Sequence, residues 1–202
     1  MSASALSALR QALVQQGLDG FIVPRADEHL GEYVPASAER LAWLTGFTGS
    51  AGLAVVLAST AAVFTDGRYI LQLAEQTDPA LWQRRHVTDE PPASWLAQNA
   101  PKQGRIGYDP LLISEDGLIR YTDSGLLMVP VEQNPIDAVW IDRPAPPSAP
   151  AQPHPLAYAG RSSEDKRAEV ARLLREAKQD AAVLTDPASI AWLLNIRGGD
   201  VP

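Results

Sequence analysis

Apolar residues recur along the first 140 positions with two different spacings, which predict alternating helices and strands. Leu6, Leu9 and Leu13 fall on one face of a helix over residues 4–16, and Gly17 is placed to end that helix. Continuous short apolar runs are instead typical of buried strands. We expect strands at residues 19–23, 53–57, 61–65 and 81–87, helices at residues 37–44, 68–76 and 93–99, and the same alternation at residues 105–108, 114–122, 126–129 and 136–140.

A short turn at residues 58–60 joins two of these apolar runs and predicts an antiparallel hairpin. Elsewhere strands alternate with helices, which is the pattern of an α/β domain with helices on both faces of one sheet. Because it contains the hairpin, the sheet must be mixed rather than purely parallel. The predicted fold class is therefore α/β with a mixed β-sheet.

A proline-rich segment interrupts this alternation. Residues 143–155 read RPAPPSAPAQPHP, with six prolines in thirteen positions. Proline fixes φ and lacks a backbone donor, so the segment cannot form a helix or a central strand. We interpret it as a linker, and a long surface loop within one domain is the alternative. The predicted domains are residues 1–143 and 156–202, joined by a linker at 144–155.

Two stretches of the sequence repeat the same order of elements. The first has a helix, then LDGFIV at 18–23, then RLAWLTGF at 40–47. The second has a predicted helix that Ser162 caps, then QDAAVL at 179–184 as a strand, then SIAWLLNI at 189–196. Both contain Ala-Trp-Leu at the same place, which indicates a duplicated domain. We expect the second copy to be truncated after Pro202 and the chain to be a fragment of a longer protein.

Composition and charge exclude several classes of function. The 202 residues are 46% hydrophobic and 20% charged, which is enough to build a core. The net charge of −7 and the absence of any Lys/Arg run argue against nucleic acid and anionic membranes as partners. The chain has no cysteine, so disulfides and thiol nucleophiles are excluded. Without an apolar stretch of membrane length or a signal peptide, a cytoplasmic location is expected.

The glycine-rich segment GFTGSAG at residues 46–52 does not match a phosphate-binding loop. Such a loop needs G-x-G-x-x-G between a strand and a helix. Here a predicted helix precedes the glycines and a strand follows them. We interpret the segment as a turn that leads into a strand, and a nucleotide-binding enzyme remains the weaker alternative.

One polar segment, PRADEHLGEY at residues 24–33, follows the first predicted strand and carries chemically active side chains. Asp27, Glu28, His29 and Glu32 are of the types that bind first-row divalent ions. No second cluster of metal-binding residues lies near them in the sequence. A solvated or hydrogen-bonding loop is therefore the favoured interpretation, and a metal site is the alternative.

A second polar segment, TDGRY at residues 65–69, follows a predicted buried strand and opens a helix. Side chains at such junctions often point into a cleft. Arg68 could hold a carboxylate and Tyr69 could donate its hydroxyl. The equal alternative is that Asp66 caps the turn and pairs with Arg68. Neither polar segment makes a self-sufficient catalytic site.

The motifs together resemble a known family. PRADEHLGEY, RLAWLTGFTGSAG, FTDGRY, IGYDP, NPIDAVWIDRPAPP and SIAWLLNIRGGDVP occur in this order over nearly the whole chain. The ordered set is similar to the N-terminal region of the three-domain Xaa-Pro aminopeptidases, within the creatinase and prolidase group. The resemblance implies a ribonuclease-H-like α/β domain, followed by a truncated second copy.

The resemblance also implies what the chain lacks. The family's catalytic domain would follow this region and hold two divalent metal ions, manganese or zinc, that activate water against the peptide bond before proline. None of the motifs that carry those ligands occurs here, so we expect no catalytic and no metal-binding residue in this chain. The implied partners are peptides with proline at the second position and a second copy of the chain in a homodimer.

By resemblance, the two polar segments would face the catalytic cleft or a subunit interface, and residues 196–201 would lie near the substrate path. The candidate residues are Asp27, His29, Glu32, Tyr33, Asp66, Arg68, Tyr69, Arg197 and Asp200. The leading hypothesis is a non-catalytic N-terminal part of a metallo-aminopeptidase that shapes substrate access and assembly. The alternative is a free-standing binding or oligomerisation module.

Overall fold

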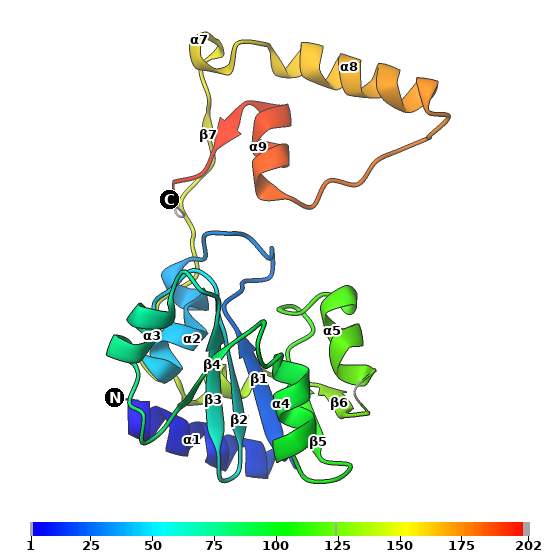
Figure 1. The fold of residues 1–202 in the computed structure, drawn as a ribbon. Helices are drawn as coiled ribbons and strands as arrows, with labels where there is room; N and C mark the ends of the chain where they lie inside the picture. Colours follow the sequence, from blue (N-terminus) through cyan, green and yellow to red (C-terminus); the bar gives the residue numbers. More distant parts are fainter. Residues whose placement is uncertain (1, 124, 200–202) are drawn as a thin grey trace. The chain divides into compact units, whose positions relative to one another are not determined.

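The structure is a computed structural model that describes residues 2–123 and 125–199. It divides into two compact units, Met1–Ala145 and Pro146–Pro202. Each unit has its own secondary structure, drawn in Figure 1.

The first unit is built on one six-stranded sheet (Figure 1). Its strands, in the spatial order β4-β3-β2-β1-β5-β6, are Gln83–His86, Ala61–Thr65, Leu53–Leu57, Gly20–Pro24, Arg105–Tyr108 and Leu127–Pro130. The strand β2 is antiparallel to both of its neighbours, and every other pairing is parallel. The predicted hairpin is thus β2–β3, and the sheet is mixed as expected.

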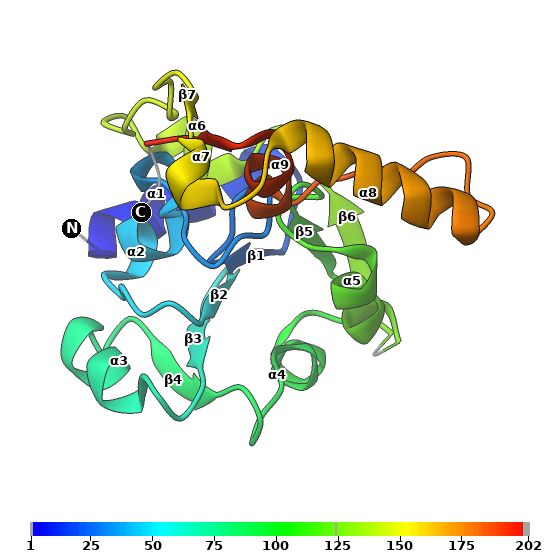
Figure 2. The ribbon, with the colours of Figure 1, turned by 90° about the horizontal axis from the view of Figure 1, so that it is seen from above.

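Helices cover both faces of this sheet (Figure 2). One face packs against α1 (Ser2–Gln15), α2 (Arg40–Thr45), α3 (Ile70–Gln76) and α6 (Pro135–Val139). The other face packs against α4 (Pro92–Asn99) and α5 (Glu115–Thr122). Each face buries its own apolar cluster, with Phe21 and Phe47 in the first and Phe64 and Trp95 in the second. The two central strands, β1 and β2, are buried on both faces, which explains their continuous apolar runs.

Two predicted helices of this unit start later than their sequence pattern suggests. Instead of one helix over 37–44, a 3₁₀ turn, η1 (Ala36–Ala38), precedes α2, and Glu39 between them leaves helical geometry with ψ of 47°. The helix predicted at 68–76 begins at Ile70, because residues 66–69 form a turn that Asp66 closes by accepting the Tyr69 and Arg68 N–H groups.

The second unit contains α7 (Leu156–Ala159), α8 (Ser163–Glu176), α9 (Pro187–Leu194) and a two-stranded pair, β7 (Gln152–Pro153) with β8 (Ile196–Arg197). The strand predicted at 180–184 does not form, and Val183 there is 88% exposed. A strand needs a neighbour to accept its backbone hydrogen bonds. No strand lies beside this segment in the described part of the unit.

No helix within residues 2–123 or 125–199 is sufficiently long and apolar to cross a bilayer.

The two units repeat one helix ending. The helices α1 and α8 both have 14 residues, and each is followed by a residue in the left-handed region, Gly17 with φ of 65° and Lys178 with φ of 55°. The Gly17 N–H donates to Val14 O, and the Lys178 N–H donates to Arg175 O at the equivalent place. A constant offset of 161 residues therefore relates the two helices.

A second helix ending is also repeated. The helices α2 and α9 contain the Ala-Trp-Leu sequence and end at Gly46 and Asn195, both in the left-handed region. In each case the N–H of that residue donates to the carbonyl of the alanine, Ala42 or Ala191. Glycine and asparagine are the residues that tolerate this geometry best.

A substitution at Gly20 tests how closely the central strand β1 packs against its neighbour β2. A Cβ at this position would lie 2.5 Å from Leu57 Cδ2 and 2.9 Å from Val56 O, so Gly20→Ala must displace the neighbouring strand β2. We expect it to lower the free energy of unfolding by about 1–3 kcal/mol, measured by urea denaturation. The control is Gly67→Ala, whose Cβ would meet only His86 Nε2 at 3.7 Å. Equal stability of the two variants would contradict the tight packing.

The repeated helix ending predicts opposite effects at equivalent positions. Gly17→Ala should destabilise the first unit by about 1 kcal/mol, because its left-handed φ strains a residue with a Cβ. Lys178→Gly should relieve the same strain and slow hydrogen exchange of the α8 amides. Lys178→Ala is the control, since it keeps the Cβ and should leave exchange unchanged. Faster exchange in Lys178→Gly would contradict the repeat.

Candidate functional site

The polar segments singled out in the sequence gather at one end of the six-stranded sheet, where its parallel strands finish. We call this end of the sheet the strand-end edge. The strands β1, β3, β4, β5 and β6 run in one direction, so their C-terminal ends share an edge. The loops that leave this edge cover residues 25–39, 66–69, 87–91, 109–114 and 131–134. The segment 46–52 enters β2 at the same edge, because Leu53 pairs with Pro24 at the end of β1. In sheets of this kind, ligands bind at the carboxyl ends of the strands.

Asp27 organises the loop that follows β1. Its side chain is buried, and Oδ1 accepts the backbone N–H groups of His29 at 3.1 Å and Gly31 at 3.3 Å. Between these two residues Leu30 adopts a φ of 53°, which is unfavourable for a bulky side chain. Asp27 is therefore a structural residue that holds a strained turn, and this turn leaves His29 exposed.

Arg25 ties this loop to the glycine-rich segment. Its Nη1 donates to Glu32 O at 2.8 Å and to Ser50 O at 3.3 Å, and its Nη2 lies 3.6 Å from Glu39 Oε1. Burial raises the pKa of Glu39, and the charge of Arg25 offsets part of that rise. The Arg25 side chain is only 11% exposed, so these partners compensate for the burial of its guanidinium group.

The turn at 66–69 is closed by an exposed ion pair. Arg68 donates from Nη2 to Asp66 Oδ2 at 2.8 Å, and the guanidinium also lies over the Tyr69 ring, 5.1 Å from its centroid. Hydrogen bonds from Arg68 lower the pKa of Asp66, and Asp66 in turn raises the pKa of Arg68, with a smaller contribution from the charge of Glu32. The Tyr69 hydroxyl is 2.7 Å from Ser50 Oγ. The turn is thus coupled to both other segments at this edge.

The glycines of GFTGSAG serve packing at this edge. A Cβ on Gly49 would lie 2.3 Å from the Phe47 ring, so only glycine fits there. Thr48 binds the α3 side chain of Gln76, which accepts its backbone N–H at 2.9 Å. The segment leads into a strand and presents no helix N-terminus to a phosphate.

An apolar pocket of about 490 Å³ lies beside the strained turn. Its lining includes Leu30, Leu53, Val87, Pro92 and Tyr121. Burial raises the pKa of Tyr121 to about 12, so its hydroxyl is neutral at physiological pH. The edge therefore combines exposed charged groups with an apolar hollow.

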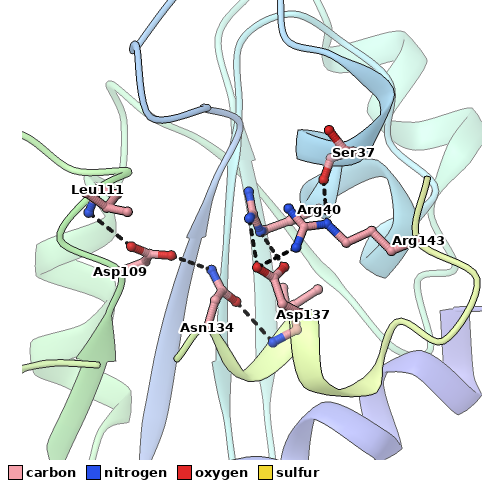
Figure 3. Close-up of polar contacts among 8 residues, drawn as sticks. Ser37, Arg40, Asp109, Leu111, Asn134, Asp137 and Arg143 are labelled. Atoms are coloured by element: carbon pink, nitrogen blue, oxygen red, sulfur yellow. Dashed lines mark hydrogen bonds and ion pairs between the residues drawn. The ribbon is translucent and has the colours of Figure 1, made fainter. Parts of the chain in front are cut away.

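A charged network that the sequence does not reveal joins α2, α6 and the segment that follows α6 (Figure 3). Asp137 on α6 accepts two hydrogen bonds from Arg40 on α2, at 2.7 and 2.9 Å, and pairs with Arg143 at 2.7 Å. Arg143 Nε also donates to Ser37 O at 2.8 Å. Burial lowers the pKa of Arg40, but the hydrogen bonds and charge of Asp137 outweigh burial and raise it overall.

Asp109 makes a second set of polar contacts, with Leu111 and Asn134 (Figure 3). Its Oδ1 accepts the Leu111 N–H at 3.0 Å and its Oδ2 accepts from Asn134 Nδ2 at 2.9 Å. Asn134 in turn caps α6 by accepting the Ile136 N–H. These contacts fix the loop after β5 against the start of α6, so Asp109 has a structural role in this loop.

The structure brings together seven of the nine candidate residues. Those at 27–33 and 66–69 share the strand-end edge and are linked through Arg25 and Ser50. Arg197 lies on β8 in the second unit, and Asp200 is outside the described residues. Sequence reasoning missed Arg25, Arg40, Asp137 and Arg143, although each of them lies within one of the motifs that carry the family resemblance. Within residues 2–123 and 125–199, no three His, Asp or Glu side chains are placed to hold a metal ion.

Comparison with known proteins agrees with the resemblance seen in the motifs. Residues 6–133 match the model of the creatinase/prolidase N-terminal domain, and residues 142–202 match a second model of that description. A probable Xaa-Pro aminopeptidase P of Aspergillus flavus and human Xaa-Pro aminopeptidase 2 are each 38% identical over 98% of this chain. The chain covers 31% and 30% of those proteins, so it spans about a third of their length.

A solved structure gives the same relation. The X-prolyl aminopeptidase of Caenorhabditis elegans, described as a cytosolic enzyme with a di-nuclear active site, matches all of this chain with a TM-score of 0.87 and 30% identity. The chain covers 36% of that protein. The mixed sheet, the two matched segments and these relatives lead to one conclusion: the chain belongs to the creatinase/prolidase N-terminal domain family.

Proposed function

We propose that this chain is the non-catalytic N-terminal part of an Xaa-Pro aminopeptidase, an enzyme that removes an N-terminal residue preceding proline. The observation that carries the proposal is the 38% identity to Xaa-Pro aminopeptidases over 98% of the chain. The reaction would then use two divalent metal ions, manganese or zinc, held by a catalytic domain outside these 202 residues.

We further propose that the strand-end edge controls substrate access. It presents exposed His29 and Tyr33 on the loop that buried Asp27 organises, and exposed Arg68 on the turn that Asp66 closes. Charged side chains on rigid turns can select and orient a peptide, whose two ends carry opposite charges. Assembly as a homodimer and a cytoplasmic location belong to the same proposal, and the cytosolic C. elegans relative supports the latter.

The proposal that catalysis requires a further domain is tested by measuring peptide cleavage. The 202-residue chain should leave Arg-Pro-Pro uncut, because no three His, Asp or Glu side chains in its described part are placed to hold a metal ion that would activate water. The gene product extended to the length of the relatives should release arginine in the presence of Mn²⁺ or Zn²⁺, followed by chromatography. The extended protein treated with a chelator is the control. Metal-dependent turnover by the 202-residue chain would overturn the proposal, and a stop codon directly after Pro202 would favour the free-standing module.

The access role is tested in the extended enzyme by Arg68→Ala. Loss of one charge-assisted contact costs about 1.5 kcal/mol, so KM for a tripeptide substrate should rise by about tenfold with little change in kcat. Arg68 is exposed and its pair with Asp66 adds little to stability, so the fold should persist. Lys102→Ala, at an exposed position on the opposite edge of the sheet, is the matched control. An unchanged KM in Arg68→Ala would exclude this residue from substrate access.

A further inference from the structure

The second unit contains a buried lysine with an unusual set of partners. Lys166 on α8 is 3% exposed, and its Nζ donates to Trp192 O at 2.9 Å and to Asn195 Oδ1 at 2.7 Å. The same Nζ lies 4.7 Å from the centroid of the Trp192 ring. The helix α9 ends here, so the ammonium group meets both the electron-rich face of an indole and the negative end of a helix.

The repeat identifies the equivalent place in the first unit. Lys166 precedes Lys178 by twelve residues, and Ala5 precedes Gly17 by the same number, so Ala5 stands on α1 where Lys166 stands on α8. On the partner helix, Trp43 and Gly46 are the equivalents of Trp192 and Asn195. The first unit therefore keeps the tryptophan and the helix end but replaces the lysine and the asparagine with much smaller residues.

A pocket lies at this place. It has a volume of about 720 Å³, and its lining includes Ala5, Trp43 and Gly46. Two carboxylates, Asp78 and Asp142, also line it, whereas none of the described residues that line it is lysine or arginine. Trp43 stacks on Trp140 with the ring centroids 5.4 Å apart, which fixes the orientation of the indole.

We propose that this pocket binds a primary ammonium group carried on an alkyl stem. The ammonium group lies against Trp43 at the carbonyl end of α2, as Lys166 does against Trp192. Asp78 and Asp142 supply the negative charge, and the alkyl stem packs on the apolar lining around Leu81 and Ala8. The source of the group is either a small alkylamine or a lysine side chain of a polypeptide, which share this chemistry.

The test is a titration of the 202-residue chain with butylammonium, followed by NMR of the Trp43 indole and Gly46 amide protons. We expect saturable shifts at both positions in the millimolar range. Butan-1-ol, which has the same stem without the charge, should produce no saturable shift. Equal shifts with the alcohol, or no saturable shift with the amine, would overturn the proposal.

Variants locate the binding site. Asp78→Asn with Asp142→Asn should weaken butylammonium binding by about tenfold while leaving the fold intact, since both side chains are exposed. Asp116→Asn with Glu132→Gln removes two charges elsewhere on the surface and should leave binding unchanged. Equal affinity in the two double variants would contradict a role for the rim carboxylates and overturn the proposal.

Ala5→Lys restores the residue of the second unit and should abolish binding of the added amine, because its own ammonium group fills the pocket. Gly46→Asn is avoided, since a Cβ there would lie 2.9 Å from Gln76 O. Undiminished binding in folded Ala5→Lys would overturn the assignment. Tighter binding of Nα-acetyl-lysine N-methylamide than of butylammonium points to a polypeptide lysine as the source, and the reverse order points to a free amine.

Discussion

The carboxylate of Asp137 is the contact on which the architecture of the first unit depends. It receives hydrogen bonds from Arg40 and an ion pair from Arg143, and so joins α2, α6 and the segment that leads out of the unit. Arg40 is 7% exposed, and a buried guanidinium without a partner would be strongly unfavourable. Removal of Asp137 would leave two cations facing each other, so the pairing fixes the position of α2 over the sheet.

The position of α2 then determines the edge where the candidate site lies. The helix ends at Gly46 and delivers the chain directly into the glycine-rich segment, which is held to α3 through Thr48 and to the first loop through Arg25. The turn at 66–69 joins the same assembly through the hydroxyls of Ser50 and Tyr69. The loops at this edge are therefore tied to one another and to α3 by hydrogen bonds.

The sequence is sufficient to predict those features that depend on local pattern. Apolar runs locate the central strands and their hairpin, and the order of the motifs identifies the family. Long-range polar pairs are beyond this reasoning, because Arg40 and Asp137 are 97 positions apart and each looks like an ordinary surface charge. The strand predicted at 180–184 is wrong for a related reason, because strand formation also depends on a distant partner. An apolar run becomes a strand only where another strand pairs with it.

The repeat shows how one scaffold can diverge at a single contact. Both units hold an Ala-Trp-Leu helix against a 14-residue helix, and both end the shorter helix in the left-handed region. The second unit satisfies that helix end internally, because Lys166 and Asn195 reach each other over the indole. In the first unit, alanine and glycine at those places remove this internal contact, and the core beneath is stabilised instead by the Trp43–Trp140 stack and the Asp137 network. A unit that has a second means of fixing its helices can lose the lysine without losing the fold, and the surface that is released becomes available for recognition.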